Sequence, residues 1–129
     1  MDVVASLVDK SLLRPAGALG GARFSMLATL RDFALRRLAA RPDADAVYRR
    51  LAEYVVRLVS DCALDQWRAC EDDGWRRRVA DELANVRSAL DWATTNDPDL
   101  AARIAVWMQH YWSSRGLGLE GHARFAELL

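Results

Sequence analysis

The chain has 129 residues, of which 52% are apolar and 28% charged, a composition typical of one globular domain or of two small units. Its 18 basic and 18 acidic residues balance, which excludes a strong global attraction to nucleic acid or to an anionic membrane. Two cysteines are too few for a disulfide framework, and neither a signal peptide nor a membrane-length apolar run is visible. We therefore expect a cytoplasmic protein.

The first 26 residues predict a helix followed by a β-hairpin. Asp2 can cap a short helix over residues 2–11, because Val4, Leu7 and Val8 keep helical spacing behind it. Two short stretches with strand character then flank the Gly-rich segment 16–21. A helix with such a hairpin is the outline of a wing, as in winged-helix modules.

The rest of the chain predicts consecutive antiparallel helices. A first helix runs from Met26 to about Arg41, and a second begins at Asp43 or Asp45. Residues 64–74 are less regular, and Asp72 or Asp73 can cap a third helix that continues through Ala93.

A fourth helix has clear start and stop signals. Asp97 can serve as its N-cap with Pro98 at the first helical position, and Gly116 can end it. Residues 118–129 predict a further helix that reaches Leu129 without a cap, so we expect the helical region to be truncated there.

Two of these helices carry two apolar faces each, where one face is enough to dock a helix on a core. In residues 85–93 (NVRSALDWA), Val86, Leu90 and Ala93 form one stripe, and Ala89 and Trp92 form a second. We expect the second face to pack toward the helix that carries Trp107 and Trp112. Two-faced helices are typical of stacked helical repeats, although a compact bundle also needs wide apolar faces.

The chain lacks the motifs of common enzymes and metal sites. Nucleophile elbows, HExxH, CxxC and the P-loop pattern GxxxxGK[ST] are all missing. His110, His122, Cys62 and Cys70 do not have the spacing of a usual zinc site. The five tryptophans fall mostly on apolar stripes, so we interpret them as core residues. Arg76, Arg77 and Arg78 point in three directions on a helix, so we interpret them as solvated residues. We expect no intrinsic catalysis, no cofactor and no metal.

Three stretches, in this order, resemble bacterial signal-transduction ATPases of the STAND class, the NB-ARC-like transcriptional regulators that often carry LuxR-type domains. Residues 7–13 (LVDKSLL) and 23–34 (RFSMLATLRDFA) are similar to the family pattern "LVDKSLL…RYRMLETVREYA", with Ala28 in place of Glu and Phe33 in place of Tyr. Residues 82–93 (ELANVRSALDWA) resemble "E-x-x-N-L-R-A-A-L-x-W-A". Residues 112–116 and 120–121 resemble "W-x-x-R-G-x-x-x-E-G". The roles of Asn85 and Arg87 in this pattern do not follow from the sequence.

The resemblance implies a mainly α fold with two parts. Residues 1–41 would form the C-terminal part of a winged-helix module with a short β-hairpin, and residues 42–129 antiparallel tetratricopeptide-like repeats. In the family, the winged helix packs on the nucleotide-binding domain and reports whether ADP or ATP is bound, while the repeats sense an inducer or a protein partner. The ATP-binding motifs would lie outside this chain.

The leading hypothesis is thus a non-catalytic regulatory and protein-interaction segment of a STAND-type transcriptional regulator. Its partners would be the rest of its own full-length protein, an inducer or protein partner, and a second copy bound through the exposed repeat end. Two sets of packing residues are predicted: Phe24, Met26, Leu30 and Phe33 between the winged helix and the helices, and Val86, Leu90, Trp92, Trp107 and Trp112 for repeat stacking.

The alternative is a DNA-binding winged helix with a helical dimerisation tail, in which Lys10, Arg14 and Arg23 contact phosphates. Val3, Val4, Leu7 and Val8 dominate its first helix and leave few polar side chains for base edges.

The leading hypothesis predicts that the chain does not bind duplex DNA tightly. Gel-shift titrations across a range of salt concentrations test this prediction. Tight, steeply salt-dependent binding that is lost in Arg14→Ala and Arg23→Ala would support the DNA-binding alternative instead.

Overall fold

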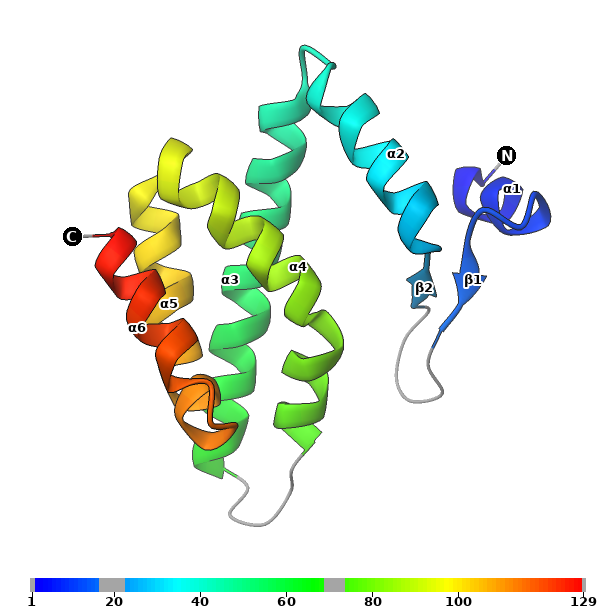
Figure 1. Cartoon of the computed structure of the whole chain (residues 1–129). Helices are drawn as coiled ribbons and strands as arrows, with labels where there is room; N and C mark the ends of the chain where they lie inside the picture. Colours follow the sequence, from blue (N-terminus) through cyan, green and yellow to red (C-terminus); the bar gives the residue numbers. More distant parts are fainter. Residues whose placement is uncertain (1, 17–22, 69–73, 129) are drawn as a thin grey trace. The chain divides into compact units, whose positions relative to one another are not determined.

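The computed structural model describes residues 2–16, 23–68 and 74–128, which are mainly helical with one short β-hairpin (Figure 1). This confirms the predicted fold class. The chain divides into two compact units, Met1–Ala44 (unit 1) and Asp45–Leu129 (unit 2). Unit 1 contains α1 (Val3–Asp9), β1 (Arg14–Pro15), β2 (Phe24–Ser25) and α2 (Ala28–Ala39), and α3 (Ala44–Arg68) begins at its last residue. Unit 2 continues with α4 (Gly74–Asn96), α5 (Pro98–Ser114) and α6 (Gly118–Glu127).

Helix α1 is closed at both ends by local hydrogen bonds. The Asp2 carboxylate accepts a hydrogen bond of 3.0 Å from the backbone N–H of Val4, as expected of an N-cap. At the other end Ser11 adopts a left-handed conformation (φ 56°), and the N–H of Leu12 donates to the carbonyl of Leu7 at 2.9 Å. The helix therefore turns sharply into the hairpin.

The hairpin pairs two-residue strands in antiparallel register. Arg14 lies opposite Ser25 and Pro15 opposite Phe24, and the N–H of Ala16 donates to the carbonyl of Arg23 at 2.8 Å. The predicted Gly-rich tip, residues 17–22, lies outside the described residues. Both strands are exposed, and neither α1 nor α2 buries a residue.

Unit 2 contains the hydrophobic core. Buried side chains come from α3, α4 and α5, and α5 packs against α4 on one side and α6 on the other (Figure 1). The largest fully buried side chains include Val55, Val86, Leu90, Ile104, Met108 and Trp112. Helix α3 extends to Arg68, so the irregular segment predicted over residues 64–74 is wrong for residues 64–68, which are helical. The candidate caps Asp72 and Asp73 lie outside the described residues.

The ends of α5 follow the sequence signals. The Asp97 carboxylate accepts a hydrogen bond from the N–H of Leu100 at 3.2 Å, with Pro98 in the first turn. Gly116 has a φ of 70°, which glycine adopts without strain, and the N–H of Leu117 donates to the carbonyl of Trp112 at 2.8 Å. The chain can therefore reverse and lay α6 along α5.

Helix α6 approaches α5 closely at a glycine. A Cβ on Gly121 would lie 2.9 Å from Cε3 of Trp112, a side chain that is 2% exposed. The ring of Phe125 meets Trp112 edge-on, with centroids 6.2 Å apart. Gly121 thus allows the two helices to pack around the indole of Trp112.

We predict that Gly121→Ala destabilises unit 2 by about 1–3 kcal/mol, because the added methyl group overpacks a buried aromatic ring. Chemical denaturation with far-ultraviolet circular dichroism measures the change. Gly118→Ala is the matched control on the same helix, since a Cβ there would meet nothing within 4 Å. Equal stability of the two variants would show that the close approach is unimportant.

Candidate functional site

The second apolar face of α4 contacts α3, the helix before it. The rings of Trp92 and Tyr48 stack with centroids 6.4 Å apart, and the Trp92 Nε1–H donates to the Asp45 carboxylate at 3.1 Å. The guanidinium of Arg49 lies 5.5 Å from the Trp92 ring centroid. The prediction that Trp92 packs toward the helix of Trp107 and Trp112 is therefore wrong. Because Trp92 projects from a different side of α4 than Val86 and Leu90, it meets the preceding helix instead.

The other tryptophans differ in their burial. Trp75 and Trp112 belong to the core, and Trp75 meets Tyr111 edge-on with centroids 6.4 Å apart. Trp107, in contrast, is 37% exposed and is not part of the core that the described residues form. The buried arc of α5 is centred on Ala101 and Met108, and Trp107 lies at its margin, so the core interpretation is wrong for this residue. The side chain of Trp67 lies outside the described residues.

The polar residues of the NVRSALDWA segment have distinct partners. Arg87 forms a bidentate ion pair with Glu120 of α6, at 2.8 and 2.7 Å. One helical turn later Asp91 pairs with Arg124 of α6 at 2.7 Å. The Asn85 amide donates to the mostly buried Glu82 carboxylate at 2.6 Å. Two ion pairs, Arg87–Glu120 and Asp91–Arg124, therefore link α6 to α4.

The ion pair with Arg87 also changes the acidity of Glu120. The hydrogen bond from the guanidinium lowers the pKa of the Glu120 carboxyl, and partial burial opposes this effect. A carboxyl whose pKa is lower in the folded state stabilises the fold above its unfolded pKa, and the contribution disappears as pH falls through the folded pKa. The fastening of α6 is thus expected to weaken in acid.

The residues predicted to join the winged helix to its neighbours lie on the surface of unit 1. Phe24 is 42% and Phe33 54% exposed, while Met26 and Leu30 are half-buried. The guanidinium of Arg37 lies 5.5 Å from the Phe33 ring centroid. None of the described residues of unit 1 is buried, so no core within the described part of unit 1 covers this apolar set.

The candidate phosphate contacts come from three places in unit 1. Lys10 follows the end of α1 and Arg14 lies on β1, both exposed, while Arg23 is half-buried before β2. Helix α1 has seven residues, and most of them are apolar. Its polar surface is too small for direct readout of a major groove.

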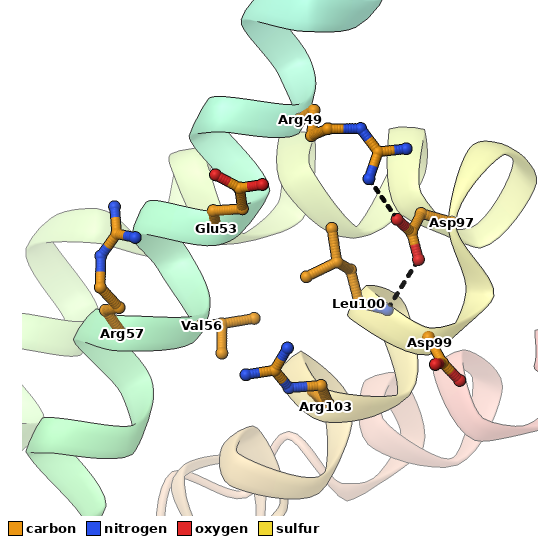
Figure 2. Close-up of a pocket in the computed structure, with 8 residues that line it drawn as sticks. All are labelled: Arg49, Glu53, Val56, Arg57, Asp97, Asp99, Leu100 and Arg103. Carbon is orange, nitrogen blue, oxygen red and sulfur yellow. Dashed lines mark hydrogen bonds and ion pairs between the residues drawn. The ribbon is translucent and has the colours of Figure 1, made fainter.

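A cavity of about 450 Å³ lies between α3 and the start of α5 (Figure 2). Its lining residues are Arg49, Glu53, Val56 and Arg57 from α3, and Asp97, Asp99, Leu100 and Arg103 around the start of α5. Sequence analysis missed this site, because its two halves are about 45 positions apart and neither forms a motif. The i, i+4 spacing of Arg49, Glu53 and Arg57 was the available signal.

The described residues support neither a metal site nor a membrane-spanning helix. Residues 2–16, 23–68 and 74–128 contain no cluster of His, Cys, Asp and Glu that could hold a metal ion. His110 instead lies beside the Trp75 ring, with centroids 5.5 Å apart. Among the helices described, none has the length and apolar character needed to cross a bilayer.

The chain is similar to a segment of named mycobacterial proteins. It is 30% identical over 133 residues, covering the whole of this chain, to the "Putative HTH-type transcriptional regulator Rv0890c" of Mycobacterium tuberculosis. It is also 30% identical, again over the whole of this chain, to the "Putative HTH-type transcriptional regulator Mb0914c" of Mycobacterium bovis. The chain spans 14% of the length of these relatives. No family model and no solved structure matches it.

We predict that Arg87→Ala lowers the free energy of unfolding at neutral pH by about 0.5–1 kcal/mol, because both partners of this ion pair are partly exposed. The difference from the wild-type chain shrinks as acid protonates Glu120. Urea titrations at neutral and acidic pH measure it. Arg57→Ala, on an exposed side chain without a described ion pair, is the matched control. A loss independent of pH would contradict the assignment to Glu120.

Proposed function

We propose that the chain is a non-catalytic regulatory and protein-interaction segment of a transcriptional regulator of the STAND class. The similarity to proteins named as HTH-type transcriptional regulators, over the whole chain, supports the general role. The STAND assignment rests on the three sequence stretches at residues 7–34, 82–93 and 112–121. Arg87 and Glu120, which belong to two of these stretches, form the ion pair between α4 and α6.

The observation that carries this proposal is the contrast between the two units. Unit 2 has a continuous core, whereas none of the described residues of unit 1 is buried. Unit 1 also exposes several large apolar side chains: Val3, Phe24, Leu27, Phe33 and Leu35. A segment of this size without a core does not fold stably alone, and an exposed apolar surface marks an interaction site. Unit 1 is therefore proposed to be one part of a module that another region of the parent protein completes.

The proposed mechanism is mechanical. Nucleotide exchange in the parent protein, or binding of an inducer, would change the packing around unit 1 and so release an inhibitory contact. The helices of unit 2 would act as the sensor, and a second copy could associate through their exposed end. In this mechanism the apolar side chains of unit 1 bind the rest of the parent protein more strongly in the inhibited state than in the released state.

This chain would not itself handle the nucleotide. Its sequence lacks the P-loop pattern GxxxxGK[ST], since the Lys10-Ser11 pair follows Asp9 and not a glycine. ATP or ADP would bind in a neighbouring domain, so no chemical step is assigned to residues of this chain.

The DNA-binding alternative is less favoured. Lys10 follows the end of α1 and the other two basic residues lie on or beside the hairpin strands, and Asp9 at the end of α1 would repel phosphate. The helices of unit 2 provide stacking surfaces, which the alternative uses only for dimerisation.

Three observations test the proposal. The coding sequence in frame with this chain is expected to contain a P-loop on its N-terminal side. The purified chain is expected to hydrolyse no ATP. The substitution Phe33→Asp in the longer gene product is expected to change transcription of a reporter at least about fivefold, which corresponds to a coupling free energy of about 1 kcal/mol. Arg36→Asp, on the same helix but outside the apolar set, is the control.

An in-frame stop codon without an ATPase would overturn the proposal. ATP hydrolysis by the purified chain would do the same. Equal transcription with Phe33→Asp and with the wild-type gene would show that unit 1 is not a regulatory contact.

A further inference from the structure

The cavity between α3 and α5 has the size of a small-molecule site. Its volume of about 450 Å³ lies within the usual range for such pockets. Val56 and Leu100, which are 5% and 7% exposed, contribute apolar surface from the edge of the core. The cavity thus has an apolar part held by the rigid portion of unit 2.

Two charged residues of the lining, Arg49 and Asp97, form an ion pair with each other. Arg49 donates to Asp97 at 2.6 Å, and Asp97 also accepts from the N–H of Leu100 (Figure 2). The hydrogen bond from Leu100 and then that from Arg49 lower the pKa of Asp97, which therefore stays ionised. Neither residue needs a ligand, and together they fix the start of α5 against α3.

Four further charged side chains line the cavity: Glu53, Asp99, Arg57 and Arg103, of which Arg103 also attracts Asp97 electrostatically. Within the described part of the chain, no hydrogen bond or ion pair is formed by the side chains of Glu53, Arg57 and Arg103. Glu53 and Arg57 project from α3, and Arg103 projects from α5 on the opposite side of Val56 and Leu100 (Figure 2). Besides the Arg49–Asp97 pair, the cavity therefore presents two carboxylates, Glu53 and Asp99, and two guanidinium groups, Arg57 and Arg103, around a small apolar patch.

We propose that this cavity binds a small zwitterion with an apolar side chain, that is, a free amino acid or a short peptide. The ligand carboxylate would pair with Arg103 and Arg57, and the ammonium group with Glu53. A simple anion would be repelled by Glu53 and Asp99, and a simple cation by Arg57 and Arg103. The apolar side chain would cover Val56 and Leu100. This inference rests on the proposed function, because it names the ligand class of the helical sensor.

A further exposed apolar side chain lies on the same face of α5 as Arg103. Trp107 follows Arg103 by one helical turn on α5 and is 37% exposed. It can contact the second side chain of a dipeptide, and its fluorescence can report binding.

Isothermal titration calorimetry on the whole chain tests the proposal, with L-leucine and leucyl-leucine as probes. N-acetyl-leucine lacks the ammonium group and leucinamide lacks the carboxylate. We expect saturable binding of at least one zwitterion, and about tenfold weaker binding of both blocked compounds. If neither zwitterion binds at millimolar concentration, or if a blocked compound binds equally well, the proposal is wrong.

Variants connect the binding to the cavity. Arg103→Ala and Glu53→Gln are each expected to weaken binding about tenfold, with circular dichroism showing the same helix content as the wild-type chain. Arg115→Ala, an exposed arginine at the end of α5, is the control and should bind normally. Unchanged affinity in Arg103→Ala would place the ligand elsewhere. Because this test uses neither ATP nor transcription, its failure is distinct from failure of the proposed function.

Discussion

The structure of unit 2 depends on one constraint, that α4 must be covered on two sides. Val86, Leu90 and Ala93 are buried in the core, while Trp92 reaches α3 through Tyr48 and Asp45. Helix α5 has the same property, since it packs against α4 and α6. A helix with two apolar faces cannot be left at an edge without exposing one of them. The cavity lies beside the start of α5, where Asp97 caps the helix.

Unit 1 is the opposite case, because its apolar side chains have no core to enter. Phe24, Leu27 and Phe33 remain exposed, although Phe24 lies on a paired strand and Phe33 within a regular helix. Local hydrogen bonds determine the shape of such a segment, whereas its stability must come from burial against another surface. The apolar surface of unit 1 and the charged cavity of unit 2 thus offer two different kinds of contact, one suited to a protein surface and the other to a small ligand.

Much of the fold could be predicted from local chemistry. The Asp2 cap, the Asp97-Pro98 start of α5 and the Gly116 stop are decided by a few neighbouring residues, and the structure has all three. The partner of Trp92 and the exposure of Trp107 could not be predicted, since they depend on how helices rotate against one another. The ion pair of Arg87 with Glu120 joins positions 33 residues apart, and the cavity joins positions farther apart still. Periodicity indicates that a face is apolar, but not which helix will cover it.

The central claim is that another region of a larger protein covers unit 1. Hydrogen–deuterium exchange of the backbone amides in α2, compared between this chain alone and the longer gene product, tests it most directly. The predicted result is fast exchange in α2 of the isolated chain beside slow exchange in α4 and α5, and strong protection of α2 in the longer protein. Exchange in α2 that is equally fast in both would contradict the claim.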